Sequence, residues 1–157
     1  MLQPEELTVW SRLSRADRRE SIAVAHRTGM ALSGTEYDGD PRWIAAALLH
    51  DVGKLDARFG PVRRALATTA AAVCGPGMVE SWIDKSGFVR RCALYVFHDQ
   101  LGGERLRMAG CRREASLWAE AHHRPAIWGA TGIPAAVVVA LAEADGERTT
   151  GFALSSP

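Results

Sequence analysis

Apolar residues recur along almost the whole chain at the three- and four-residue spacing of amphipathic helices. Ser14 followed by Asp17, and Asp40 followed by Pro41, supply typical helix-start signals. The expected helices are Pro4–Leu13, a second from Ser14 past Met30, Pro41–Asp51, Pro61–Val73, Met78–Asp84, Gly87–Phe97, Cys111–His123 and Pro134–Asp145. The expected interruptions are Ser33–Asp40, the segment after Gly53, Cys74–Gly77, Leu101–Leu106 and the proline- and glycine-rich stretch 123–134.

These elements predict an all-α fold. The 157 residues suit one domain, with a core from about 18 to 147 and a loosely held tail at 148–157. A hydrophobic fraction of 47% and a charged fraction of 24% are typical of soluble globular proteins. A net charge of +1 gives no general attraction for nucleic acid.

Location is predicted from the apolar runs, the first residues and the cysteines. The longest apolar run, 133–142, is about half of the roughly 20 residues that span a bilayer, so no membrane association is expected. The first ten residues carry acidic side chains where a signal peptide has basic ones. Three widely spaced cysteines fit reduced thiols better than a disulfide framework, namely Cys74, Cys92 and Cys111. We therefore expect a cytoplasmic protein.

The strongest local motif is LLHDVGK, residues 48–54. His50 and Asp51 offer an imidazole nitrogen and a carboxylate oxygen, and both atoms bind divalent metals. Gly53 lets the chain turn sharply after them. Lys54 can reach towards a bound anion, and it is one of only two lysines among 19 basic residues.

Three other places carry residues that can bind metals. His98 ends an apolar run, His122 and His123 are adjacent, and Asp145 ends the last apolar helix. A carboxylate facing the core at position 145 needs a partner, which a metal or a helix cap would provide. Each residue alone has an ordinary structural explanation. With His50, however, four of the five histidines occupy such positions, so together they predict a metal site.

The order His-Asp-x-Gly-Lys, His, His-His, Asp resembles the HD superfamily of metal-dependent phosphohydrolases over about residues 18–147. The stretch from HDQLGGERL through EAHHRP to IPAAVVVALAEADG is similar to the HD-GYP subgroup. The resemblance implies a compact HD-domain helical bundle with a two-metal centre. It further implies one ion held by His50, Asp51 and Asp145, with Asp51 bridging, a second ion held by His98, His122 and His123, and Lys54 beside the substrate phosphate.

The chain departs from the family pattern at its first ligand. Members usually open with a histidine in a motif like HSxxVA, whereas the matching stretch here is ESIAVAH. Glu20 takes the place of that histidine and is itself a good ligand for harder metals. His26 is the alternative, but it lies about 120° from Glu20 around a helix, which favours Glu20. Glu20 as a surface charge remains the third possibility.

A second departure concerns the substrate. The segment after HHRP lacks the Gly-Tyr-Pro triplet through which the subgroup contacts cyclic di-GMP, which weakens that substrate assignment. Arg124 directly follows the histidine pair and could bind a second phosphate or a carboxylate, although one more surface arginine is common in an arginine-rich chain.

The sequence therefore predicts a phosphomonoesterase or phosphodiesterase acting on a nucleotide or another small phosphate ester. Its cofactors would be divalent ions, two in number, of iron, manganese, magnesium, cobalt, nickel or zinc. Asp51 and Lys54 are the expected catalytic residues. Two alternatives stay open: a di-iron oxygenase on the same scaffold, and a non-catalytic metal-binding sensory or interaction module. Oxygenases of this superfamily tend to carry a further histidine after the His-Asp pair, where this chain has Lys54.

Overall fold

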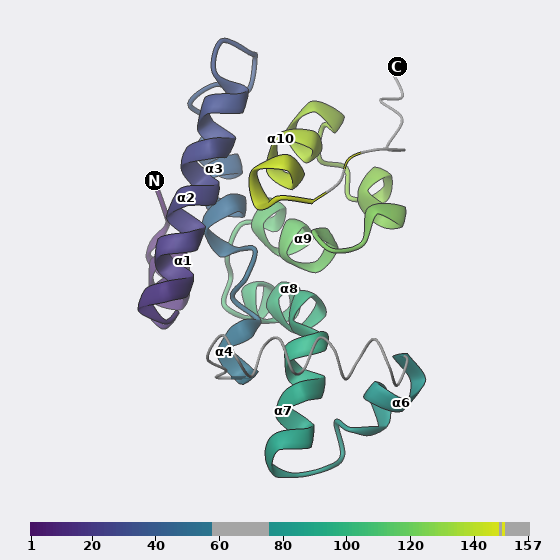
Figure 1. The fold of residues 1–157 in the computed structure, drawn as a ribbon. Helices are drawn as coiled ribbons and strands as arrows, with labels where there is room; N and C mark the ends of the chain where they lie inside the picture. Colours follow the sequence, from purple (N-terminus) through teal and green to yellow (C-terminus); the bar gives the residue numbers. More distant parts are fainter. Residues whose placement is uncertain (58–75, 148, 150–157) are drawn as a thin grey trace.

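The computed structural model describes residues 1–57, 76–147 and 149, and all regular structure in these residues is helical (Figure 1). This confirms the expected all-α fold for the described part of the chain. The elements are α1 (Pro4–Ser11), α2 (Arg15–Leu32), α3 (Pro41–Leu49), α4 (Lys54–Ala57), α6 (Pro76–Ser81), α7 (Gly87–Val96), α8 (His98–Met108), α9 (Arg113–Ala121), the 3₁₀ helix η1 (Pro125–Ala130) and α10 (Ala135–Asp145). The helix expected at 61–73, the cysteine at 74 and nearly all of the expected tail fall outside the described residues.

The two helix-start signals work as the sequence predicts. The Ser14 hydroxyl accepts a hydrogen bond from the backbone N–H of Asp17 at 3.2 Å, which caps α2. The Asp40 carboxylate accepts one from the backbone N–H of Arg42 at 2.9 Å, which caps α3. These bonds satisfy N–H groups that have no partner inside the helix.

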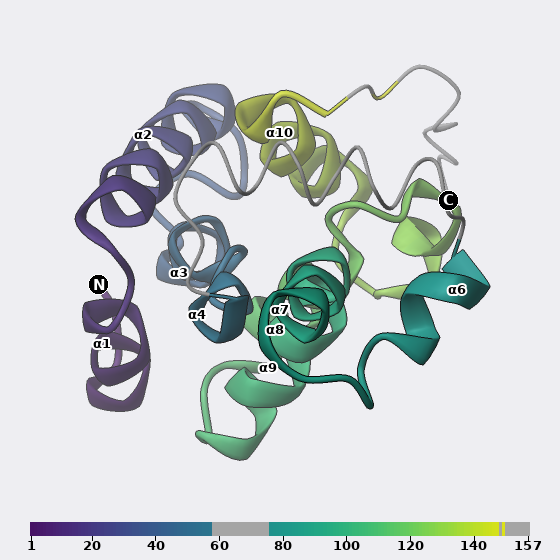
Figure 2. The same cartoon turned by 60° about the horizontal axis from the view of Figure 1, so that its bottom comes forward.

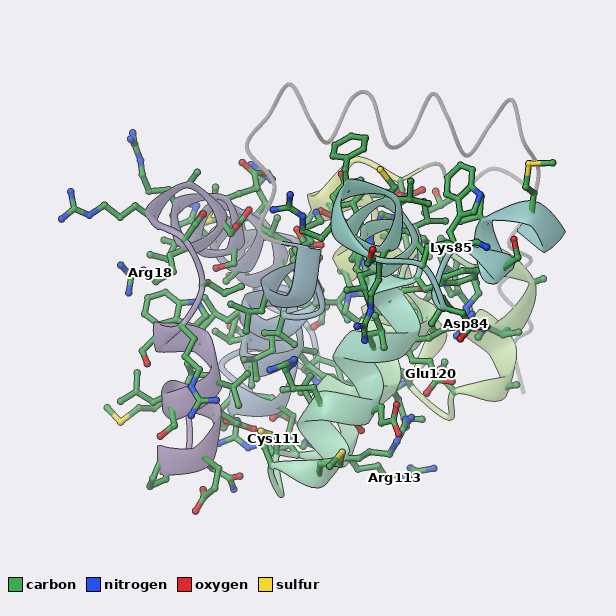
Figure 3. All side chains as sticks on the ribbon, turned by 90° about the horizontal axis from the view of Figure 1, so that it is seen from below. Arg18, Asp84, Lys85, Cys111, Arg113 and Glu120 are labelled. Carbon is green, nitrogen blue, oxygen red and sulfur yellow. The ribbon has the colours of Figure 1, made fainter. Side chains whose placement is uncertain are left out.

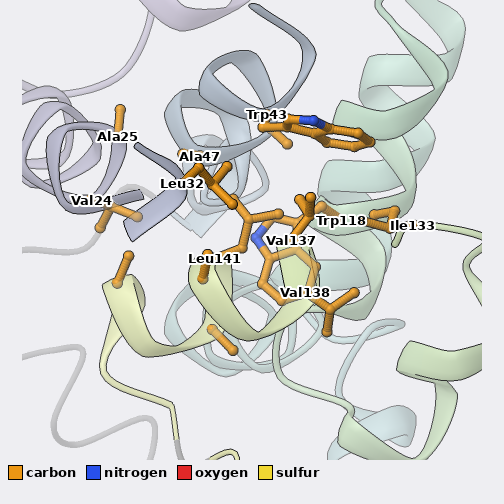
Figure 4. Close-up of a cluster of buried hydrophobic side chains, with 14 of the residues drawn as sticks. Val24, Ala25, Leu32, Trp43, Ala47, Trp118, Ile133, Val137, Val138 and Leu141 are labelled. Carbon is orange, nitrogen blue, oxygen red and sulfur yellow. The ribbon is translucent and has the colours of Figure 1, made fainter. Parts of the chain in front are cut away.

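Helices α2, α3, α9 and α10 enclose the main hydrophobic core (Figures 1, 2 and 4). Helix α3 contacts α2 on one side and α9 on another, and α10 packs along α2. Trp43 from α3, Trp118 from α9 and Leu141 from α10 are almost fully buried in this core (Figure 4). The hydrophobic effect of burying these large side chains therefore fixes where the ends of α3, α9 and α10 meet.

The segment Leu101–Leu106 differs from its predicted structure. We expected its paired glycines to interrupt the helical pattern, but α8 runs through them. A Cβ at Gly103 would lie 2.7 Å from the Glu120 Cβ and 2.9 Å from the Ser116 carbonyl oxygen. Gly103 therefore allows α8 to pack closely against α9, and it does so without breaking the helix.

The N-terminal helix is joined to α9 through one arginine. The Glu6 side chain is fully buried, and it accepts a hydrogen bond from the backbone N–H of Arg112 at 3.2 Å. The Arg112 guanidinium donates to the carbonyls of Met1 and Pro41. Its neighbour Arg113 extends into solvent instead (Figure 3). This network holds α1 beside the start of α3.

Among the described residues, no helix is both long enough and apolar enough to cross a membrane.

Candidate metal centre

Six of the seven predicted ligands come from the ends of four helices. His50 and Asp51 directly follow α3, and His98 is the first residue of α8. His122 and His123 follow α9, and Asp145 ends α10. The four most deeply buried of these residues are His50, Asp51, His98 and His122, each at most 6% exposed. Helix packing thus brings together residues that are widely separated in the sequence.

Asp51 lies at the middle of the cluster, and its two oxygens face different partners. Oδ1 is 3.4 Å from Nε2 of His98 and 3.7 Å from Nε2 of His122. Oδ2 is 3.5 Å from Nε2 of His50 and accepts a hydrogen bond from the Lys54 ammonium group. Asp145 also reaches the cluster, with its Oδ1 3.2 Å from Nε2 of His50. A single carboxylate therefore contacts three imidazoles and a lysine.

The backbone orients three of the imidazole rings in the same way. Nδ1 of His50 is 2.8 Å from the Ala47 carbonyl oxygen, and Nδ1 of His98 is 2.7 Å from that of Tyr95. Nδ1 of His122 is 2.9 Å from the Ala119 carbonyl oxygen. A carbonyl can only accept, so each Nδ1 carries a proton, and in the neutral ring Nε2 keeps its lone pair. In this tautomer each Nε2 faces Asp51 and can bind a metal once its ring is neutral.

Four buried polar atoms of the cluster have no hydrogen-bond partner in the described residues. They are Nε2 of His50, His98 and His122, and Oδ1 of Asp51. A buried polar atom without a partner is costly, and such atoms are rare in folded proteins. Imidazole nitrogens converging on a carboxylate oxygen form a donor set that suits divalent first-row metals. The residues present therefore fit a metal ion.

His123 extends the cluster towards the surface. One ligand atom each from Asp51, His98, His122 and His123 lie within 4.8 Å of one another. A second such group joins His123 to Asp145 and Glu147. The His122 and His123 ring centroids are 4.0 Å apart. The two groups share His123, which therefore lies next to Asp145 and Glu147 as well as to the buried ligands.

Burial and mutual contact set the charges in the cluster. Burial lowers the pKa of His122 to about 3, so this ring is neutral. Burial also opposes a charge on His50, but Asp51 and Asp145 outweigh it and raise the pKa of His50 to about 9. For Asp51, burial works against ionisation, yet the nearby imidazoles and Lys54 hold its pKa well below the usual range. Asp51 is therefore ionised, the state in which a carboxylate binds metal.

Gly53 allows the loop after α3 to reach this position. The sequence suggested that Gly53 serves a sharp turn, and it does lie in one. The turn does not explain the glycine, however, because its φ is not positive. A Cβ at Gly53 would lie 1.7 Å from the His98 carbonyl oxygen. Glycine is required because two backbones touch, one carrying Asp51 and the other His98.

The structure does not bring Glu20 or His26 into the cluster. The Glu20 side chain is 60% exposed, and its Oε1 pairs with the Arg27 guanidinium at 3.1 Å. Nε of Arg27 also donates to the Ala144 carbonyl at 2.7 Å, so Glu20 lies on the side of α2 near the end of α10. His26 is exposed to solvent.

The two predicted phosphate-binding residues have different surroundings. Lys54 lies at the cluster itself, with its ammonium group on Asp51. Arg124 is held by protein groups: its Nε is 3.2 Å from Oδ2 of Asp99, and its Nη2 donates to the Glu120 carbonyl at 2.6 Å. Of the two, Lys54 is the cation that the structure brings to the metal ligands.

Glu147 was not predicted from the sequence. Its Oε1 is 2.7 Å from Nδ1 of His123. No motif marks this residue, and the only signal was its position just beyond the glycine that ends the last helix.

Comparisons with protein-family models, with curated proteins and with solved structures gave no match to this chain. Functional interpretation therefore depends on the arrangement of the chain's own residues.

Proposed function

We propose that this chain is a metal-dependent phosphohydrolase that cleaves a nucleotide or another small phosphate ester, as its resemblance to the HD superfamily implies. The observation that carries the proposal is the set of buried, partnerless ligand atoms of His50, Asp51, His98 and His122. Lys54 adds a cation directly beside these atoms. A positive charge next to a metal site is what a phosphoryl group requires.

Each residue has a definite role in this proposal. Asp51 would be shared between two ions, the first held with His50 and Asp145 and the second with His98, His122 and His123. When bound, divalent ions polarise a phosphoryl oxygen and acidify a water molecule. The backbone carbonyls at Ala47, Tyr95 and Ala119 keep three rings turned with Nε2 towards Asp51. Lys54 would move from Asp51 to the substrate phosphate.

Lys54 also favours hydrolysis over oxygen chemistry. A di-iron oxygenase of this superfamily tends to have a further histidine near this position, and an added imidazole would bind metal. An ammonium group has no lone pair for a metal, but it does bind phosphate.

We further propose a cytoplasmic location, which the thiols of Cys92 and Cys111 support because neither forms a disulfide.

The first experiment combines metal analysis with activity screens. The purified chain would be reconstituted with Mn²⁺, Fe²⁺, Co²⁺, Ni²⁺, Zn²⁺ or Mg²⁺, and its metal content measured by mass spectrometry. Each sample would then be assayed with p-nitrophenyl phosphate, bis(p-nitrophenyl) phosphate and a panel of nucleotides. We expect close to two ions per chain and turnover that Asp51→Asn abolishes. His26→Ala is the matched control, because this exposed histidine lies outside the cluster.

Other results would reject the proposal. A chain that takes up no ion and hydrolyses no ester would be a non-catalytic module. Oxygen consumption by the ferrous sample, without ester hydrolysis, would identify an oxygenase instead.

A further inference from the structure

The fourth imidazole of the cluster is oriented differently from the other three. His50, His98 and His122 each bond through Nδ1 to a backbone carbonyl three residues earlier. His123 bonds through Nδ1 to a carboxylate oxygen of Glu147, at 2.7 Å. His123 is also the most exposed of the four, with 39% of its side chain accessible. Its orientation therefore depends on one side chain from a distant part of the sequence.

The end of α10 holds Glu147 in place. Gly146 has φ +87°, and its backbone N–H donates to the Glu143 carbonyl at 3.1 Å. The Glu147 backbone N–H donates to the Ala142 carbonyl at 2.9 Å. These bonds form the left-handed glycine turn that commonly ends a helix and reverses the chain. The turn sends the residue after Gly146 back towards the cluster, where its side chain contacts His123.

We propose that Glu147 is a positioning residue that accepts a hydrogen bond from the Nδ1–H of His123 and so leaves Nε2 free to bind a metal ion. This inference rests on the metal centre of the proposed function. A carboxylate that accepts from a ligand histidine fixes the tautomer and orientation of the ring and makes its other nitrogen more basic. For His123 the carboxylate does what backbone carbonyls do for the other three rings.

The geometry favours positioning over direct metal binding by Glu147. A separation of 2.7 Å is a normal length for a hydrogen bond from imidazole to carboxylate. The oxygen that makes this bond has one of its lone pairs committed to it. Glu147 is also one-third exposed, unlike the buried carboxylate of Asp51.

The first test measures the His123 tautomer in the metal-free protein. Long-range proton–nitrogen NMR at pH 8.5 distinguishes a ring protonated at Nδ1 from one protonated at Nε2, and the His123 signals are those absent from His123→Asn. We expect Nδ1 protonation in the original chain and a shift towards Nε2 protonation in Glu147→Ala. Glu147→Gln should retain the original tautomer, because its amide oxygen still accepts the hydrogen bond.

The second test measures Co²⁺ affinity by titration of the full chain. Loss of an orienting carboxylate weakens metal binding by about 10- to 100-fold, and we expect this for Glu147→Ala. Glu147→Gln should have an intermediate affinity, because it keeps the hydrogen bond but loses the charge. Glu143→Ala is the matched control: it removes an exposed carboxylate from the last turn of α10, one that bonds to Thr149 and not to a histidine.

The two tests fail in distinguishable ways. An unchanged His123 tautomer in Glu147→Ala would overturn the positioning role, whether or not the protein binds Co²⁺. Loss of one whole ion in both variants, with the tautomer unchanged, would identify Glu147 as a direct ligand and also overturn it. Absence of Co²⁺ binding by the original chain would reject the proposed function, while the tautomer measurement would still decide the contact between Glu147 and His123.

Discussion

The backbone of Gly53 packs directly against the backbone of His98. A Cβ added at Gly53 would lie 1.7 Å from the His98 carbonyl oxygen and 2.8 Å from the Gly102 backbone nitrogen. Neither of these atoms belongs to a flexible side chain that could move aside. This contact joins the loop that carries Asp51 to the helix that begins at His98, so the spacing of two proposed metal ligands depends on it.

Gly53→Ala should therefore damage both stability and metal binding. The clash forces the loop away from α8, and we expect a loss of free energy of unfolding on the order of 3 kcal/mol. For a domain of this size that corresponds to a fall in melting temperature of about 10 °C, measurable by circular dichroism. Gly129→Ala is the control, because a Cβ there meets nothing within 4 Å and its φ is not positive. Equal melting temperatures for the two variants would show that the loop can move without cost.

Metal removal should destabilise the fold. Without an ion, the ligand nitrogens of His98 and His122 stay buried without hydrogen bonds. An ion present at 100 times its dissociation constant adds about 2.7 kcal/mol, or roughly 5–10 °C in melting temperature for a domain of this size. Dialysis against EDTA should lower the melting temperature by that amount, and added Mn²⁺ should restore it. His122→Gln should make the protein insensitive to EDTA, whereas His26→Gln should leave the response intact.

Much of the fold and the site could be predicted because local chemistry determines them. Helix-start residues such as Ser14 and Asp40 act within their own turn, and the apolar spacing is a property of the sequence alone. The LLHDVGK motif placed His50 and Asp51 at a helix end for the same reason.

The remaining features depend on contacts between segments distant in the sequence. Gly102 and Gly103 look like a break until the Gly53 backbone lies against the first and α9 against the second. Glu147 looks like a surface charge until the turn at Gly146 directs it to His123. Glu20 was assigned to the family's first metal-ligand position because the residues around it match that motif. The motif cannot show that the Glu20 side chain pairs with Arg27 instead.

Glu20→Gln tests that family position directly. Because the Glu20 carboxylate is 60% exposed and paired with Arg27, we expect the variant to bind Co²⁺ as the original chain does. An exposed pair of this kind contributes little to stability, so the melting temperature should also be unchanged. Titration with Co²⁺ measures the first effect and thermal unfolding the second. A tenfold or greater loss of affinity would mean that Glu20 leaves Arg27 and binds the ion, as the motif predicts.

Lys54→Met should separate metal binding from catalysis. The side chain of Lys54 is 16% exposed and bonds to Asp51, but it offers no lone pair to an ion while it is protonated. Methionine keeps an unbranched side chain of nearly the same length and removes the charge, so we expect metal content by mass spectrometry to stay at the original value. Loss of one group that stabilises developing charge costs about 100-fold in kcat, and hydrolysis of p-nitrophenyl phosphate should fall by that factor.

Lys85→Met is the control for this experiment, because it replaces the only other lysine, which is exposed (Figure 3). Removing Lys54 also leaves the Asp51 carboxylate with one positive neighbour fewer. An ion bound to Asp51 would compensate for that loss, so metal affinity should stay the same or rise. A fall in metal content together with kcat would show that Lys54 acts by holding Asp51 in place. Unchanged kcat would remove Lys54 from the reaction.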